Sequence, residues 1–266
     1  MATPSYKDIQ AFSRTSKQLS EAAKREFRKA IKPSMSAKQI QEIAVQIAAE
    51  FRIYGAELGA QWYEYCSRVA GIDIEPAVLE ANSYEKARAS AAAVVESGGT
   101  LTSEQAARVF QEYLERQILE SIRTTGSANL HRDYERGLCS GRWARVPVGD
   151  TCAFCMMLAS QGAWYLSEKS ALGDTADHYH NNCDCTAVYH ADANNIAGYS
   201  ALFDYKEKYY SADNARRANE SGKEPYPEDL AERIKHAKEN HARVSDEEWT
   251  KYNEDLIVMR YKYDLK

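Results

Sequence analysis

The stretch Thr151–Cys185, TCAFCMMLASQGAWYLSEKSALGDTADHYHNNCDC, is the most distinctive part of this chain of 266 residues. It holds four of the six cysteines and two of the six histidines. The other two cysteines, Cys66 and Cys139, stand alone in the sequence. Four explanations fit such a cluster: a bound metal ion, disulfides, a reactive thiol, and plain packing.

The spacing within this stretch is typical of a zinc site. Cys152 and Cys155 form a Cys-x2-Cys pair, whose turn brings two thiolates to one ion. A second group returns after a loop, and it consists of His180, Cys183 and Cys185. Because Zn²⁺ takes four ligands in a tetrahedron, we expect the first pair and two members of the second group to hold one structural zinc ion per chain. His178 is a weaker further candidate.

Two other interpretations of the cluster stay open. A redox pair needs a thiolate at a helix N-terminus beside a partner thiol, and Cys152 and Cys155 do open a predicted helix. A disulfide, such as one between Cys155 and Cys183, would hold the same loop in an oxidising environment. We favour the metal because a redox pair leaves the returning group unexplained. The N-terminus also lacks a secretory signal pattern, and a reducing cytosol disfavours disulfides.

The cluster lacks the sequence patterns of catalytic zinc sites. A zinc deaminase needs His-x-Glu before Pro-Cys-x-x-Cys, and a zinc protease uses His-Glu-x-x-His. Neither pattern is present, and neither is a Gly-x-Ser-x-Gly motif or a Gly-rich phosphate loop. A closed, thiolate-rich site has no open coordination position, which favours a structural role. We therefore expect a protein that is not an enzyme.

Long helices are predicted before the cluster. A first helix spans roughly residues 6–32, and Pro33 ends it. Ser36 and Gln39 then form a capping-box pattern at the start of a long helix that stops near Gly71. Residues at steps of three and four give this second helix an apolar stripe: Ile40, Ile43, Ile47, Phe51, Tyr54, Leu58, Trp62, Tyr65 and Val69.

Two features of the second helix allow alternatives. Gly55 and Gly59 lie one turn apart, so they either let another helix approach closely or are tolerated weak points. The stripe ends in large aromatic residues such as Trp62. It packs against the chain's own helices, or it presents these rings to a partner, since aromatic anchors dominate many interfaces.

Further elements complete the predicted order. Helices are expected at residues 83–96 and 102–123, and Gly126 is expected to break the second of these before a shorter helix to about Leu138. Strands are predicted at GRWARVPV (141–148), AWYLS (163–167) and CTAVYHA (185–191), with a short helix at FCMMLASQ (154–161). Beyond Asn194 the chain is charged and helical. Breaks are expected at Gly222, Pro225 and Pro227, and Ser245 with Glu248 is expected to cap the last helix.

This order predicts a mainly α fold with a small α+β module. We expect an N-terminal helical domain at residues 1–139, a Cys/His metal-binding α+β module with a zinc-ribbon-like core at 140–192, and a helical C-terminal tail at 193–266. The net charge of −5 gives no electrostatic reason for the whole chain to coat DNA or an anionic membrane. No stretch approaches the ~20 apolar residues of a membrane span.

The sequence RWARVPVGDTCAFCMMLASQGAWY, followed by HYHNNCDCTAV, resembles the minor head (minor capsid) proteins of tailed phages, the group similar to the phage Mu F head-morphogenesis proteins. In that family an Arg-Trp-x-Arg-Val-Pro strand precedes a Cys-x-x-Cys helix, a Gly-x-x-Tyr strand and a His-x-x-Cys-x-Cys return. The counterparts here are Arg142–Pro147, Cys152–Ser160, Gly162–Tyr165 and His180–Cys185. Asn181 and Asp184 replace the more common Pro and Arg of the return, which removes a basic residue and argues against a DNA contact there.

The resemblance implies a structural protein of the virion, made in the cytoplasm of the bacterial host. Such a protein acts at the portal region or inside the phage head during assembly and DNA packaging or ejection. Its expected partners are the portal protein, the major capsid protein or both, further copies of itself and, more weakly, packaged DNA, with no membrane contact. The alternative is a zinc-dependent nucleic-acid-modifying enzyme or toxin with its site at the Cys/His cluster.

Overall fold

A computed structural model of the protein describes residues 2–79, 82–98, 101–148, 153–160, 185–190, 201–244 and 251–264. Within these ranges the chain is mainly helical and contains a small two-stranded sheet, as predicted. The predicted zinc-ribbon-like core falls largely outside them and stays a prediction. Among the described helices, none is both long enough and apolar enough to cross a membrane.

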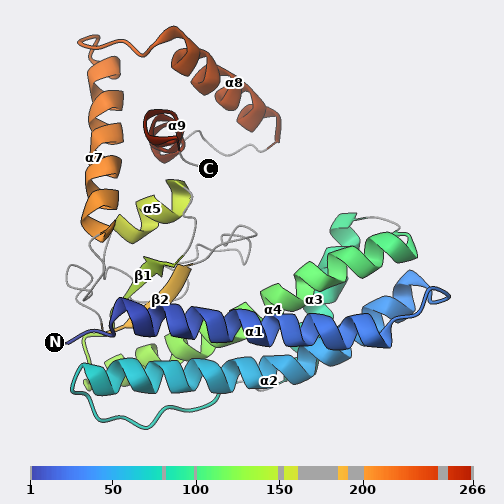
Figure 1. Ribbon diagram of the computed structural model, residues 1–266. Helices are drawn as coiled ribbons and strands as arrows, with labels where there is room; N and C mark the ends of the chain where they lie inside the picture. The colour runs from blue at the N-terminus through green and yellow to red at the C-terminus, as the bar shows by residue number, and fades with distance from the viewer. Residues whose placement is uncertain are drawn as a thin grey trace.

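The N-terminal part is a layer of helices: α1 (Tyr6–Ala30), α2 (Ala37–Val69), α3 (Ser83–Gly98) and α4 (Ser103–Glu135). The two longest, α2 and α4, pack against each other, α1 packs on both of them, and α3 lies against α2 (Figure 1). Capping boxes begin α2 at Ser36 and Gln39 and α4 at Thr102 and Gln105, which confirms both predicted helix starts. A third capping box, at Ser5, begins α1.

The glycines of α2 mark its closest approach to α4. A Cβ built on Gly55 would stand 3.1 Å from the carbonyl oxygen of Ile118. A Cβ on Gly59 would stand only 2.3 Å from the carbonyl oxygen of Ile122, inside any permitted contact. The first interpretation of these glycines is therefore confirmed, because the backbone of α4 occupies the space that a side chain would need.

The buried face of α2 differs from the predicted stripe. Tyr54, a member of the stripe, is 43% exposed. Trp62 is buried, so it belongs to the chain's own core rather than to a partner surface. Ile40, Phe51 and Trp62 of the stripe are buried, and the buried face also holds small residues that the stripe did not include, namely Ala44, Ala48, Gly55, Ala56, Gly59 and Ala60. A close contact between two helices requires small side chains. The spacing of large apolar residues in the sequence does not reveal them.

The prediction that Gly126 breaks a helix is wrong. Helix α4 continues through this residue to Glu135. A Cβ on Gly126 would lie 2.0 Å from the hydroxyl oxygen of Tyr189, which comes from the second strand. The glycine makes room for that phenol, and packing offsets the roughly 1 kcal/mol that a glycine costs inside a helix.

The small sheet consists of β1 (Trp143–Pro147) and β2 (Cys185–Tyr189), paired antiparallel with Trp143 opposite Tyr189 and Pro147 opposite Cys185. Helix α5 (Ala153–Ser160) lies between them in the sequence. These three elements confirm two of the predicted strands and the short helix. The predicted strand at 163–167 lies outside the described residues.

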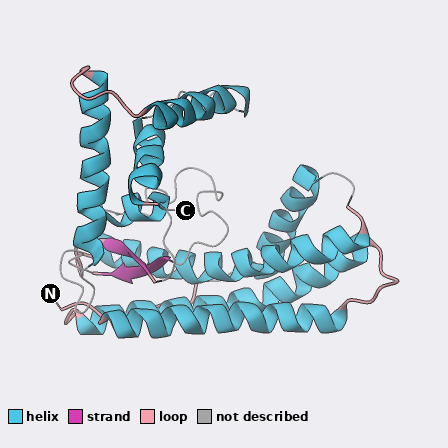
Figure 2. Ribbon diagram, turned by 45° about the horizontal axis from the view of Figure 1, so that its top comes forward, coloured by secondary structure: helices cyan, strands magenta, loops and turns pink. Residues whose placement is uncertain are grey.

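The C-terminal part contains α7 (Ala201–Glu220), α8 (Glu228–Val244) and α9 (Lys251–Tyr263). The break predicted between residues 222 and 227 is present, and Gly222 there has a φ of +71°. The predicted cap at Ser245 and Glu248 lies outside the described residues. These helices stand away from the N-terminal layer, at the end where the sheet lies (Figures 1 and 2). A buried ion pair joins α7 to α9, with Arg216 Nε 2.7 Å from Asp255 Oδ1.

One apolar cluster of described residues draws on all three predicted domains. Its members include Ile9, Tyr63, Leu130, Trp143, Val146, Met156, Val188, Tyr205, Leu230, Val258 and Met259. The sheet therefore sits in the core between the long helices and the C-terminal helices. The boundaries at 139/140 and 192/193 stay predictions, and the segments that they separate share this core.

Candidate functional site

The predicted zinc ligands lie at the margin of the described structure. Cys185 begins β2 and is buried. Cys155 lies in α5, where only its backbone is described. Outside the described residues lie Cys152, His180, Cys183 and the weaker candidate His178. The described residues alone bring no three metal-binding side chains together, so the zinc site stays a prediction.

The register of the sheet brings the two ligand-bearing segments to one end of the hairpin. Pro147 opposes Cys185, so the end of β1 and the start of β2 lie side by side. In the sequence, Cys152 follows that end of β1 by five residues, and Cys183 precedes that start of β2 by two. Paired strands lie only about 5 Å apart, so the segment that follows β1 and the segment that precedes β2 are joined to neighbouring strand ends. Thiolates and imidazoles are also the ligands that Zn²⁺ prefers in structural sites. The residues and the strand order therefore fit the predicted ion.

Side chains of α2 hold the outer edge of β2. The indole Nε1 of Trp62 donates a hydrogen bond of 2.6 Å to the carbonyl oxygen of Ala187. Its ring stacks on Phe12 of α1, with the ring centroids 4.4 Å apart. One turn further along α2, the sulfur of Cys66 receives a hydrogen bond from the backbone of Tyr189, and burial raises the pKa of that thiol. These contacts satisfy strand edge groups that would otherwise be buried without partners.

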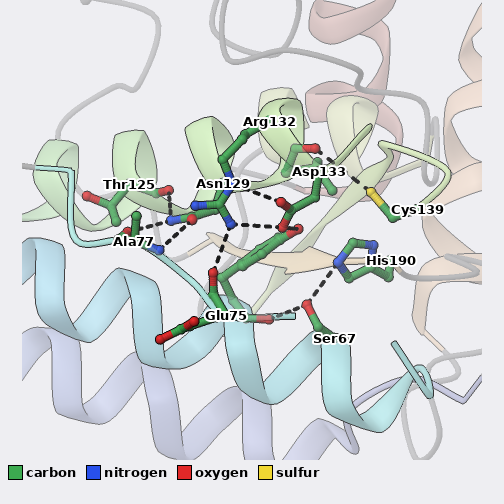
Figure 3. Close-up of polar contacts among 11 residues, drawn as sticks. Ser67, Glu75, Ala77, Thr125, Asn129, Arg132, Asp133, Cys139 and His190 are labelled. Carbon is green, nitrogen blue, oxygen red and sulfur yellow. Dashed lines mark hydrogen bonds and ion pairs between the residues drawn. The ribbon is translucent and has the colours of Figure 1, made fainter. Parts of the chain in front are cut away.

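His190, directly after β2, anchors the sheet through a second polar contact (Figure 3). It has a φ of +58° and is 3% exposed. Its Nε2 lies 3.0 Å from Ser67 Oγ, while the Ser67 hydroxyl donates to the carbonyl oxygen of Tyr63 at 2.8 Å. The imidazole must therefore carry its proton on Nε2 and donate it to Ser67. The other ring nitrogen, Nδ1, is buried with no hydrogen-bond partner among the described residues.

Asp133 of α4 is a buried charge at the junction where α2, α4 and β2 meet. Its Oδ2 accepts a hydrogen bond of 2.9 Å from the hydroxyl of Tyr63, and its Oδ1 lies 2.8 Å from Nε of Arg132. Burial, together with the neighbouring carboxylate, raises the pKa of Tyr63, so this phenol stays a proton donor. One turn earlier, Asn129 exchanges two hydrogen bonds of 2.8 Å with the backbone of Ala77, which ties the loop after α2 to α4.

The serine and histidine of this junction do not form a usable catalytic dyad. Ser67 has no exposed surface, and its proton is committed to the carbonyl of Tyr63. The carboxylate of Asp133 binds Tyr63 instead of orienting the imidazole of His190. A nucleophile must reach a substrate and have its base oriented by a third group. The contact is therefore a structural one that holds β2 on α2.

The pH dependence of stability should report on His190. Burial lowers the pKa of this imidazole to about 4, against the opposing influence of Asp133. The unfolded chain takes up a proton near its ordinary pKa of about 6.5, so stability present above that pH is lost as the pH falls toward 4. We expect a loss of about 2 kcal/mol between pH 7 and pH 5, measured by urea unfolding.

His190→Asn should flatten this pH dependence, because asparagine tolerates a positive φ but does not titrate in this range. His131→Asn is the matched control, since His131 is more than half exposed on α4. An equally steep loss of stability in His190→Asn and in the parent chain would contradict the assignment.

Sequence reasoning missed this junction. Tyr63 and Ser67 lie off the predicted apolar stripe of the second helix. Asp133 sits in a charged run of residues 131–135, and His190 follows a strand as an isolated histidine. Only the close packing of α2, α4 and β2 reveals that these four side chains meet.

Comparison with known families identifies the chain at this point. The model of the VG15 protein family matches residues 3–212. The chain belongs to the VG15 protein family. This is a family of viral proteins, as the resemblance led us to expect. The matched region covers α1 to α5, both strands and the first part of α7, while α8 and α9 lie beyond it. No curated protein and no solved structure matches the chain.

Proposed function

We propose that this VG15 protein is a minor capsid protein of a tailed phage or prophage. It would act at the portal region or inside the head during assembly and DNA packaging or ejection. The observation that carries the proposal is the continuous family match from α1 through the Cys/His stretch into α7. Because one family model spans both, the long helices and the cysteine stretch belong to the same viral protein family. The phage-like motif at residues 142–188 supplies the finer assignment.

The polar chemistry of the described core favours a binding role over turnover. Its buried charges are used for contacts between elements, as Arg216 with Asp255 and Tyr63 with Asp133 illustrate. The outward faces of the long helices offer extended surfaces to the proposed partners, the portal protein, the major capsid protein or both.

We further propose that one zinc ion per chain staples the Cys/His stretch, held by Cys152, Cys155 and two members of the group His180, Cys183 and Cys185. When bound, it would supply folding energy, since an unfolded chain offers no preformed site. The β1–β2 hairpin is short, and short strands without a further constraint are marginally stable.

Native mass spectrometry of the purified chain should show one zinc ion, lost on treatment with a chelator. Cys152→Ser should abolish zinc binding and open new protease cleavage sites within residues 142–189, while α1, α2 and α4 stay protected. Cys139→Ser is the matched control, because Cys139 lies outside the predicted ligand group and its thiol donates only a long hydrogen bond, 3.9 Å, to the carbonyl of Leu130. A zinc-free mass with two intact disulfides would refute the metal site.

The proposed role is tested in particles. A tagged copy of the full chain, expressed in the host during phage growth, should purify with virions in far fewer copies than the major capsid protein. Removal of the gene should give defective heads. If the protein is absent from particles and modifies nucleotides at a rate abolished by Cys183→Ser with the fold intact, the enzyme alternative replaces this proposal.

A further inference from the structure

The outer face of α7 carries a shallow groove that the described residues leave open. Helix α7 stands at the edge of the C-terminal part, and the groove runs along it beside the end of α9 and the turn after α7 (Figure 1). The residues of α7 that line it are Glu207, Tyr210, Ser211, Asn214, Ala215 and Ala218. Tyr210 has 53% of its surface exposed. Tyrosine is enriched at interfaces between proteins, so this face is a candidate contact surface.

The spacing of these residues is typical of a contact between two helices. Steps of four, three and four separate Glu207, Ser211, Asn214 and Ala218, which keeps them on one side of α7. The last three have short side chains, so a second helix can approach closely, as α4 approaches α2 at Gly59. The groove therefore fits another helix that packs along α7.

Each end of the groove carries a lysine followed by a glutamate. Lys206 and Glu207 lie at its start, and Lys223 and Glu224 lie at its end. Glu207 and Lys223 are exposed, and neither makes an ion pair with another residue that the structure describes. The charged side chains of α7 that lie between them are paired already. The charges at the two ends therefore remain available to a partner.

We propose that α7 of one copy packs antiparallel against α7 of a second copy, about a two-fold axis near Asn214. In this alignment Glu207 of each copy faces Lys223 of the other, and Lys206 faces Glu224. A parallel pair would bring each of these charges to its own counterpart, so repulsion disfavours it. The antiparallel contact is the same on both copies, covers the exposed tyrosine and closes as a dimer. It does not depend on the proposed role in the phage head.

One pair of helices makes a small interface, so the dimer should be in equilibrium with the monomer. Sedimentation velocity of the full chain at low salt should show a dimer fraction that rises with protein concentration. Salt screens exposed ion pairs, and the screening length falls to about 3 Å at 1 M. The dissociation constant should therefore rise as salt is added.

Charge reversal at the two ends of the groove tests the pairing. Glu207→Lys or Lys223→Glu alone replaces both attractions between these positions in the dimer by repulsions, so the dissociation constant should rise about tenfold or more. The double variant Glu207→Lys with Lys223→Glu keeps the net charge of the parent and makes every facing pair attractive again. It should associate at least as tightly as the parent. Glu232→Lys, at an exposed position of α8, is the matched control and should associate as the parent does.

Three outcomes would overturn the proposal. The first is a parent chain that stays monomeric at low salt and high protein concentration, which would leave the groove to a different protein. The second is a parent dimer that neither single variant weakens, which would place the interface elsewhere. The third is a double variant that associates as weakly as the single variants while circular dichroism shows all three folded.

Discussion

Replacing Trp62 by alanine should lower the free energy of unfolding by about 3–5 kcal/mol, the range for removing a large aromatic side chain from a core. The indole is 6% exposed, stacks on Phe12 of α1 and donates to the carbonyl of Ala187 in β2. Its removal leaves a cavity where three elements meet and an unsatisfied carbonyl on the strand edge. Urea unfolding followed by circular dichroism measures the change.

Two variants divide this effect into its parts. Trp62→Phe keeps most of the aromatic packing but removes the donor to Ala187, so it should cost less, about 1–3 kcal/mol. Tyr54→Ala removes a large ring from the exposed side of the same helix and should cost under about 1 kcal/mol. If Trp62→Ala unfolds at the same urea concentration as the parent chain, the ring is not part of the core and the docking of β2 on α2 is wrong.

Gly59→Ala should destabilise the chain by about 3 kcal/mol although alanine is the better helix former by about 1 kcal/mol. The added methyl group would meet the carbonyl oxygen of Ile122 at 2.3 Å, and that neighbour is backbone, which cannot turn away. Helices α2 and α4 would have to separate along their shared interface. Thermal and urea unfolding of the purified variant measure the loss.

Gly55→Ala is the matched control, one turn earlier on the same helix. Its added methyl group would stand 3.1 Å from the carbonyl oxygen of Ile118, so a shift of a few tenths of an ångström accommodates it. The gain in helix propensity should offset most of that cost, leaving stability within about 1 kcal/mol of the parent. Equal effects of the two substitutions would contradict the close approach at Gly59.

The elements that could be predicted from the sequence are those that local interactions determine. The starts of α2 and α4 follow from capping boxes, in which a side chain meets the backbone three residues away. The end of α1 follows from the geometry that Pro33 imposes, and the strands β1 and β2 follow from short apolar runs around the cysteines. The spacing of those cysteines indicates zinc for the same reason, because one turn sets the distance between two thiolates.

The tertiary structure decided the contacts between residues that lie far apart in the sequence. The hydrogen bond from Tyr63 to Asp133 spans 70 positions, and the one between His190 and Ser67 spans 123. Gly126 resembles a helix breaker until the phenol of Tyr189 is seen to fill the space beside it. Likewise, small residues of α2 face α4 while Tyr54 faces outward. Local propensities amount to about 1 kcal/mol per residue or less, and close packing between helices outweighs them, so burial is decided only when the whole chain is assembled.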